Sequence, residues 1–221
     1  MQIIRQRLQA IMQHDRHATS GNYTIRSLYF DDYWNTAYTE KITGIYERKK
    51  YRIRIYNSSD AIIKLECKNK VGSVVRKTAV SLTREETERI LQGDCHFLLK
   101  REEPLCHELY IQHLTRVLRP CVIVEYEREP FVHSAGDTRI TFDKQIRASS
   151  VITDFFNPKL PTTPLLDSTK LVMEVKYTEF LPTMIKNALP PKASELTALS
   201  KFTGCFEKTE RFRSLTSYGE W

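Results

Sequence analysis

The chain has 221 residues, of which 41% are hydrophobic, and a formal net charge of +7 at pH 7. This length can bury one sizeable core, and we expect a single domain over residues 1–221. No run of eighteen apolar residues occurs, and residues 1–15 lack the apolar centre of a secretory signal, so we expect a cytoplasmic protein without a membrane-inserted segment. The positive charge favours an anionic partner, which leaves nucleic acid, phosphate-rich small molecules and acidic membranes open.

The cysteines are spread along the chain, and none belongs to a Cys-x-x-Cys pair. They are Cys67, Cys95, Cys106, Cys121 and Cys205. An odd number leaves one thiol unpaired in any monomeric disulfide scheme, so we expect reduced cysteines packed in the fold. The Cys-His neighbours at 95–96 and 106–107 lack the repeated spacing of a zinc site.

The first third of the chain predicts one helix followed by four strands. Residues 2–14 carry apolar side chains at helical spacing, and residues 15–22 are expected to form a loop. Aromatic and β-branched residues then predict strands over residues 23–30, 46–56, 62–69 and 73–81. A hairpin turn is expected at Val71 and Gly72, between the last two strands.

The rest of the chain mixes helices with further strands. Thr83 and Glu86 form a capping box at the start of a helix that is expected to end at Gly93. A second helix is expected over 102–118, strands over 121–128, 137–143 and 171–177, a proline-rich loop over 157–164 and a last helix over 193–202. Because these elements show no regular βαβ alternation, they favour an α+β protein built on an antiparallel sheet or barrel.

Charged residues alternate with apolar ones along the predicted strands, and side chains two residues apart share a face. Over residues 48–56, one face carries Arg48, Lys50, Arg52, Arg54 and Tyr56, and the other carries Lys49, Tyr51, Ile53 and Ile55. The next strand sets Lys64, Glu66, Lys68 and Lys70 against Ile63, Leu65 and Cys67. Later pairs of this kind are Tyr126 with Arg128, Arg139 with Thr141 and Asp143, and Glu174 with Lys176.

Two interpretations of this alternation stay open. A single strand of this kind is typical of a half-exposed sheet with its polar face in water. Several cationic strands together favour a surface that holds a polyanion at many points, because a cationic face without a ligand repels itself. If the sheet curls into a barrel, these cations line its interior.

Several motifs resemble the VTC (vacuolar transporter chaperone) domain, in the family's order and across nearly the whole chain. They are YTIRSLYFDD (23–32), RKKYRIRIY (48–56), LECKNK (65–70), VVRKTAV (74–80), VEYER (124–128), TRITFD (138–143), MEVKY (173–177) and SKF (200–202). That domain is a triphosphate tunnel metalloenzyme. The resemblance implies an antiparallel β-barrel tunnel with flanking helices and the activity of a polyphosphate polymerase, an ATP-polyphosphate phosphotransferase.

The resemblance also implies the partners and cofactors. ATP would be the phosphoryl donor, Mn²⁺ or Mg²⁺ the metal cofactor and linear inorganic polyphosphate the product. A membrane-protein partner is implied as well, since family members often work beside membrane proteins. Without a Walker A loop or a Gly-x-Gly-x-x-Gly motif, side chains would have to hold the ATP.

The family's functional residues match this chain motif by motif. Arg52 and Arg54 are similar to the paired catalytic arginines that bind the triphosphate, with Lys68 and Lys77 on adjacent strands. Arg128 and Arg139 match arginines further along the tunnel, Glu174 resembles the carboxylate that holds the metal, and Lys201 resembles a catalytic lysine beside the reacting phosphates. Tyr126 and Ser200 are candidates for hydrogen bonds to phosphate oxygens.

One family feature has no counterpart in this chain. The family's first strand, of the form Arg-x-Glu-x-Lys-Tyr, is not found over residues 1–7, where Arg5 and Arg7 fit the surface of a helix. We therefore expect this strand to be missing. A truncated form, a barrel completed by a partner chain and a protein that binds polyphosphate without making it are all compatible with this.

Two other functions stay open besides the polymerase. A hydrolase of triphosphate or short polyphosphate would use the same kind of tunnel, and a polyphosphate-binding module would need no catalysis. Nucleic-acid binding is not expected, because the basic residues alternate within strands and no zinc finger or RNP motif occurs.

Overall fold

The computed structural model describes residues 2–15, 18, 21–189 and 199–217. In these residues the helices are α1 (Gln2–Ile11), α2 (Thr36–Thr43), α3 (Arg84–Leu91), α4 (Pro104–Arg116), α5 (Thr183–Ala188) and α6 (Lys201–Ser217). The strands are β1 (Gln13–His14), β2 (Tyr23–Asp31), β3 (Glu47–Tyr56), β4 (Ser59–Val71), β5 (Val74–Ser81), β6 (Arg119–His133), β7 (Thr138–Ser149), β8 (Thr163–Pro164) and β9 (Val172–Lys176). Short 3₁₀ segments lie at η1 (His96–Lys100), η2 (Ala135–Asp137) and η3 (Ile152–Asp154).

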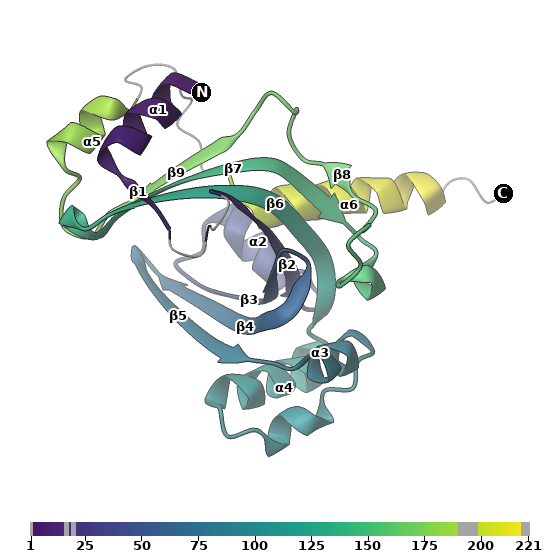
Figure 1. Ribbon diagram of the computed structural model, residues 1–221. Helices are drawn as coiled ribbons and strands as arrows, with labels where there is room; N and C mark the ends of the chain where they lie inside the picture. The colour runs from purple at the N-terminus through teal and green to yellow at the C-terminus, as the bar shows by residue number, and fades with distance from the viewer. Residues whose placement is uncertain (1, 16–17, 19–20, 190–198, 218–221) are drawn as a thin grey trace. The chain divides into compact units, whose positions relative to one another are not determined.

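The strands form one large sheet (Figure 1). Its hydrogen-bonded order is β5-β4-β3-β2-β6-β7-β8, with β1 paired to β6 and β9 to β7. Consecutive strands from β2 to β5 are antiparallel, as are the pairs that β7 forms with β8 and β9. The expected α+β class with an antiparallel sheet is confirmed, and within the described residues the sheet is not closed by hydrogen bonds between β5 and β8.

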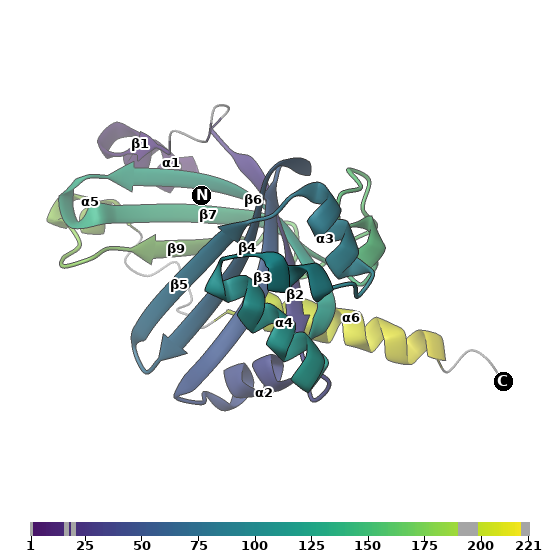
Figure 2. The same ribbon diagram turned by 90° about the horizontal axis from the view of Figure 1, so that it is seen from below.

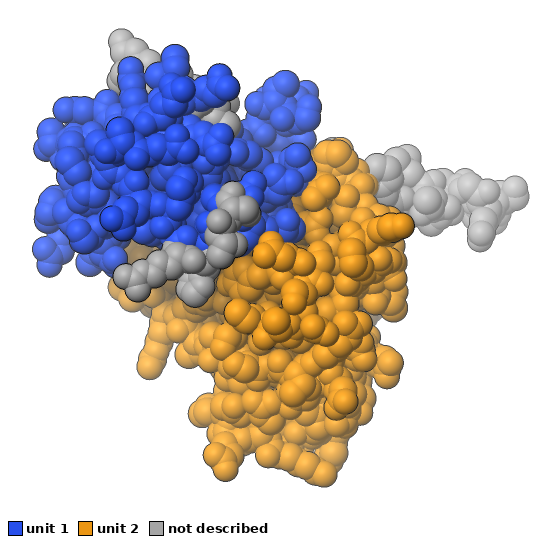
Figure 3. Space-filling model, viewed as in Figure 1, with its two compact units in different colours: residues 1–24, 126–146, 166–199 blue, residues 25–125, 147–165, 200–221 orange. Residues whose placement is uncertain are grey.

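The chain divides into two compact units (Figure 3). The first unit comprises Met1–Thr24, Tyr126–Ile146 and Leu166–Leu199, and the second comprises Ile25–Glu125, Arg147–Leu165 and Ser200–Trp221. That residues 1–221 act as one domain stays a prediction.

The core of the second unit lies between one face of β2–β5 and the helices α3 and α4, which cover that face (Figures 1 and 2). Alternate strand residues such as Ile53 and Leu65 are fully buried there, against Ile90 of α3 and Leu109 of α4. Burial of this apolar surface is the main stabilising term of the unit. It also fixes which face of each strand is left for polar side chains.

The first unit has a smaller core. Leu8 and Met12, which lie on and just after α1, pack with Phe131, Phe142 and Ile185. Helices α1 and α5 lie side by side over this cluster (Figure 1). The predicted helix near the start of the chain is confirmed, although it ends at Ile11, because Gln13 and His14 pair with β6 as the short strand β1.

Several predicted elements differ from the observed ones. The last helix was expected over 193–202, of which residues 193–198 lie outside the described part. Leu199 and Ser200 are not helical, so α6 begins at Lys201. Leu114 and Val117 are exposed although the helical period predicted them on the apolar face. Val117 lies beyond the end of α4 at Arg116 and has a left-handed backbone, so it does not continue the helical face.

Two helices were not predicted at all. Helix α2 is rich in β-branched residues and has no buried side chain, so it lacks an amphipathic pattern. Backbone N–H groups of Ala37 and Tyr38, in its first turn, donate to the carboxylate of Asp31 instead. Helix α5 has only six residues, which is too short for a clear period. Among the described residues, no helix has the length and apolar character needed to cross a membrane.

Arg26 is a fully buried cation in the second unit. Its side chain is 1% exposed, and it donates to Glu125 at 2.6 Å and to the carbonyl oxygens of Phe155 and Asn157 at 2.8 Å. Arg147 contacts the other oxygen of Glu125 at 2.9 Å. The Arg26 guanidinium therefore ties β2 and β6 to the segment after β7.

Replacing Arg26 should destabilise the fold strongly. We expect Arg26→Met to lower the free energy of unfolding by about 3–5 kcal/mol, because Glu125 would keep a buried charge with half of its partners removed. Urea denaturation followed by circular dichroism measures this change. Arg76→Met, which removes an exposed arginine of β5, is the control, and a loss for Arg26→Met no larger than that of the control would contradict the account.

Candidate functional site

Strand β3 carries core residues and predicted site residues on opposite faces. Tyr51, Ile53 and Ile55 are buried in the apolar core, whereas Lys50 and Arg52 are half-exposed on the other side. This is the two-residue period that the sequence predicted. The alternation is fixed by burial, because shifting the register by one residue would place the cations in the core.

Cross-strand pairing brings the cations of three strands together. Lys50 lies opposite Lys68, and Lys68 lies opposite Lys77. Two residues further along β3, Arg52 is paired with Tyr29 of β2 on one side and with Glu66 of β4 on the other. Arg54, two residues further again, is paired with Lys64 of β4. We call the set Lys50, Arg52, Arg54, Lys68 and Lys77 the basic face.

Glu66 is the carboxylate that organises the basic face. Its side chain is 4% exposed, and its two oxygens contact Arg52 Nε at 2.6 Å and Lys77 Nζ at 2.5 Å. Burial alone would raise the pKa of Glu66, but the charges of Arg52 and Arg54 and the hydrogen bonds outweigh it, so the pKa lies below its ordinary value. Glu66 is therefore ionised and holds both cations in place.

Tyr29 and Phe202 form an aromatic floor beside these cations. Their rings stack with centroids 5.0 Å apart, and Arg52 donates to the Tyr29 hydroxyl at 3.0 Å. Burial opposes ionisation of this phenol, yet the nearby charges of Arg52, Arg54 and Lys201 hold its pKa below the ordinary value. The buried Arg54 donates in turn to Ser27 at 3.2 Å. The charges of the predicted site residues Arg52, Arg54 and Lys201 thus all act on the Tyr29 hydroxyl.

Ser200 and Lys201 lie at the start of α6. The Ser200 hydroxyl oxygen accepts from the backbone N–H of Thr203 at 3.4 Å, which is the position of a helix N-cap. Ser200 therefore has a structural role in addition to the phosphate-binding role expected for it. Lys201 is the first residue of α6, one position before the floor residue Phe202.

A second group of predicted residues lies in the first unit. Arg128 forms a bidentate pair with Asp143, at 2.7 and 2.8 Å, and its Nη2 lies 3.9 Å from Glu174. The Arg128 guanidinium also lies 5.2 Å from the ring centroid of the buried Tyr126. Bidentate pairing and stacking fix this guanidinium in one orientation.

Arg139 is held in the same unit by two polar partners. Its Nη2 contacts Asp15 at 2.9 Å and the Tyr23 hydroxyl at 3.3 Å, while its buried Nε has no hydrogen-bond partner among the described atoms. An unsatisfied buried donor of this kind can donate a hydrogen bond to an anionic ligand.

The surroundings of Glu174 decide whether it fits the expected metal. Its carboxylate is 40% exposed, lies 3.2 Å from Lys176 Nζ and stands opposite Thr141, whose buried hydroxyl has no described partner. No cluster of three metal-ligating side chains occurs within the described residues. Mg²⁺ commonly uses one or two carboxylates, water and substrate phosphates. Glu174 fits such a sparsely liganded ion, although Lys176 competes for its oxygen.

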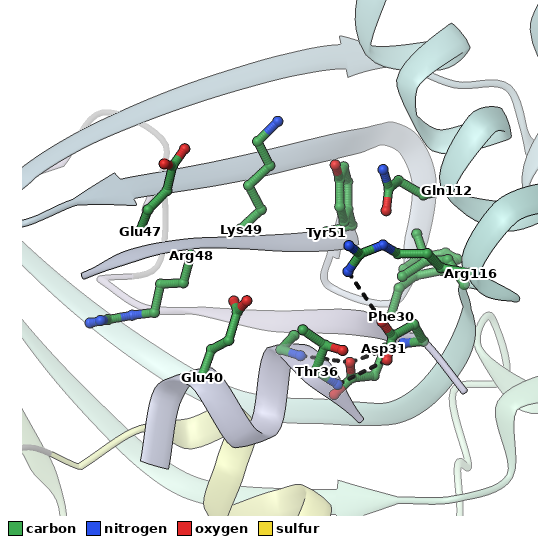
Figure 4. Close-up of a pocket in the computed structure, with 13 residues that line it drawn as sticks. Phe30, Asp31, Thr36, Glu40, Glu47, Arg48, Lys49, Tyr51, Gln112 and Arg116 are labelled. Carbon is green, nitrogen blue, oxygen red and sulfur yellow. Dashed lines mark hydrogen bonds and ion pairs between the residues drawn. The ribbon is translucent and has the colours of Figure 1, made fainter. Parts of the chain in front are cut away.

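A pocket of about 340 Å³ lies between α2, one end of β3 and α4, and residues from both faces of β3 line it, among them Arg48 and Lys49 (Figure 4). Lys49 and Tyr51 of β3 line it with Glu40 of α2 and Arg116 of α4, and Arg116 Nη1 lies 3.7 Å from Asp32. No predicted site residue lines this pocket. Its mixture of acidic and basic groups does not suit a polyanion, so we place the candidate site on the basic face instead.

Sequence reasoning did not single out several residues that the structure places in these groups. Glu66 and Asp143 appeared only as members of the polar faces, and Tyr29 only within a strand motif. Each lies at the correct two-residue parity, which is the one signal the sequence offers. Their pairing with Arg52, Lys77 and Arg128 depends on register.

The stabilising effect of Glu66 should depend on pH. We expect Glu66→Gln to lower the free energy of unfolding at pH 7 by about 1–3 kcal/mol, because charge-assisted hydrogen bonds to two cations are lost. A lowered carboxyl pKa gives stability that is present above the unfolded value of 4.5 and is lost as the pH falls through the lower folded value. The gap between wild type and variant should therefore shrink below about pH 4.5, as measured by urea denaturation at several pH values. Glu85→Gln on α3, at an exposed carboxylate, is the control, and a gap that does not change with pH would argue against the assignment.

Comparison with known proteins agrees with the motifs. The family model of the VTC domain matches residues 1–209. No curated protein sequence matches the chain. Similar solved structures include a candidate adenylate cyclase from Bacillus halodurans, which is 14% identical with a TM-score of 0.44 over 68% of each chain.

Two further structures are similar at a comparable level. A candidate adenylyl cyclase from Hippeastrum, described as having a dominant triphosphatase activity, is 12% identical with a TM-score of 0.44, over 67% of this chain and 66% of that one. A protein from Pyrococcus horikoshii is 13% identical with a TM-score of 0.39, over 97% of this chain and 85% of that one. Because the family model covers residues 1–209, the chain belongs to the VTC domain family.

Proposed function

We propose that this protein is a polyphosphate polymerase that transfers the γ-phosphoryl group of ATP to a growing inorganic polyphosphate chain with the help of a divalent metal ion. The observation that carries the proposal is the basic face, in which five cations from three adjacent strands share one surface. Membership of the VTC domain family supports the same function.

The predicted site residues of the second unit bind and activate the phosphates. Arg52, Arg54, Lys68 and Lys77 bind the phosphates of ATP and of the polymer. Arg52 is ready for this role because Glu66 and Tyr29 already fix its guanidinium, so little side-chain entropy is lost on binding. Lys201 is assigned to the reacting phosphates as a catalytic residue.

The residues of the first unit have matching roles. Arg128 and Arg139 bind phosphate groups, and Tyr126 positions Arg128 by stacking. Glu174 would hold Mn²⁺ or Mg²⁺, with the Thr141 hydroxyl beside it. When bound, such an ion neutralises charge on phosphate oxygens.

The transfer needs no nucleophilic side chain. A terminal oxygen of the polyphosphate chain attacks the γ-phosphorus of ATP, the bond from that phosphorus to the ADP oxygen breaks in line, and ADP leaves. Phosphoryl transfer of this kind depends on positioning and on stabilisation of charge on the equatorial oxygens. Fixed guanidinium and ammonium groups supply both. A membrane-protein partner, expected from the family resemblance, stays a prediction.

The direct test is a product assay. The purified chain is incubated with ATP and Mn²⁺ or Mg²⁺, with and without a short polyphosphate primer, and the products are run on a polyacrylamide gel stained for polyphosphate. Long chains together with ADP are expected. Release of orthophosphate alone would instead show a hydrolase, and tight polyphosphate binding without reaction would show a binding module.

Matched variants distinguish the loss of a basic-face cation from the loss of any other positive charge on the same sheet. Arg52→Ala and Lys77→Ala should each lower the rate of polymer formation by about 100-fold, because each removes a fixed cation at the developing charge. Glu174→Gln should abolish the dependence on metal concentration along with most of the activity. Arg76→Ala removes a β5 cation from the face opposite to Lys77, since Arg76 pairs with Asn69, and should leave the rate unchanged. Equal losses for Lys77→Ala and Arg76→Ala would refute the assignment.

A further inference from the structure

Lys50 differs from Arg52 and Lys77, the two cations of the basic face that contact Glu66. No carboxylate of the described residues lies within ion-pair distance of Lys50. Instead its ammonium group lies over the ring of Phe202, with Nζ 4.6 Å from the ring centroid. A buried aromatic face gives a weak attraction and no hydrogen bond to replace water.

The aromatic floor links Lys50 to the phosphate-binding residue Arg52. Phe202 stacks on Tyr29, and Arg52 Cζ lies 5.8 Å from the Tyr29 ring centroid while Arg52 donates to its hydroxyl. Lys50 and Arg52 are two positions apart on β3 and so share one face. Both cations therefore contact the same stacked aromatic pair, Lys50 through Phe202 and Arg52 through Tyr29. Lys68 of β4 lies directly opposite Lys50 in the sheet.

The charges around Lys50 are mostly of the same sign. Lys41 comes from α2, Arg48 from the same strand and Lys68 from β4, and Asp31 of β2 is the acidic group among them. On α6 the contacting residue is Phe202, which follows Lys201. Burial first, and then the three cations, lower the pKa of Lys50 to about 7, against the opposing effect of Asp31. Near neutral pH this amine is ready to take up a proton when negative charge arrives.

We propose that Lys50, with Lys68 facing it, forms a further phosphate subsite at which binding of a phosphate chain is coupled to the uptake of one proton. The proton comes from solvent and converts the neutral amine to an ammonium ion beside the phosphate oxygens. This inference rests on the proposed function, because it assumes that phosphate chains occupy the basic face.

The direction of the coupling between phosphate binding and proton uptake follows from comparing Lys50 with and without a bound ligand. Without ligand the amine is about half protonated at pH 7 and about one-tenth protonated at pH 8, given a pKa of about 7. A bound polyanion favours the charged form, so the ligated state binds more protons. The affinity of the wild type should therefore fall as pH rises from 7 to 8, in proportion to the protonated fraction.

The test is isothermal titration calorimetry with sodium tripolyphosphate and EDTA, in two buffers of different ionisation enthalpy. At pH 8 the wild type should take up close to one proton more than Lys50→Arg, whose charge does not titrate. The ratio of the Lys50→Arg affinity to the wild-type affinity should rise about fivefold from pH 7 to pH 8. Lys50→Met should approach the wild type in affinity as pH rises, because both then lack the charge.

A matched control lies on the same strand. Lys49 is on the opposite face and is paired with Glu108 at 2.8 Å, so Lys49→Arg should keep the proton uptake of the wild type. Tripolyphosphate binding with equal proton uptake in wild type and Lys50→Arg would overturn this inference and leave the proposed function standing. No binding of tripolyphosphate by any variant would overturn both, and circular dichroism confirms that each variant is folded.

Discussion

Burial of Ile53, Ile55 and Leu65 against helices α3 and α4 is the constraint from which the site follows. Alternate side chains of a strand point to opposite faces, so every neighbour of these residues must leave the core. Those neighbours are Arg52, Arg54, Tyr56, Lys64 and Glu66. Packing of one face thereby collects positive charge on the other, without any local sequence motif for phosphate binding.

Collecting like charges is unfavourable unless something offsets their repulsion. Glu66 does so for Arg52 and Lys77, and Asp143 does so for Arg128 in the first unit. These carboxylates also fix the geometry of the cations, so the groups are oriented before a ligand arrives. Lys50 forms no ion pair with a carboxylate of the described residues, and its burial among like charges is what makes its protonation sensitive to a bound anion.

The sequence predicted the parts of this arrangement that depend on local periodicity. Strands β3, β4 and β5, the two faces of β3 and β4 and the capping box at Thr83 all follow from residue spacing, and the structure confirms them. Features that depend on contacts between distant segments could not be predicted from the sequence. They are the hydrogen bonds from α2 to Asp31, the exposure of Leu114 near the end of α4 and the contact between Lys50 and the Phe202 ring. Register decides the pairing of Glu66, and no single strand encodes it.

The central claim is that phosphate chains bind to the basic face. Lysine acetylation followed by mass spectrometry, with and without tripolyphosphate in EDTA, tests this most directly because both faces of the sheet β3–β5 carry lysines. We expect tripolyphosphate to protect Lys68 and Lys77 from acetylation and to leave Lys49, on the opposite face of β3, and the exposed Lys100 of η1 as reactive as before. Protection of Lys49 and Lys100 to the same degree, or no protection of Lys68 and Lys77, would contradict it.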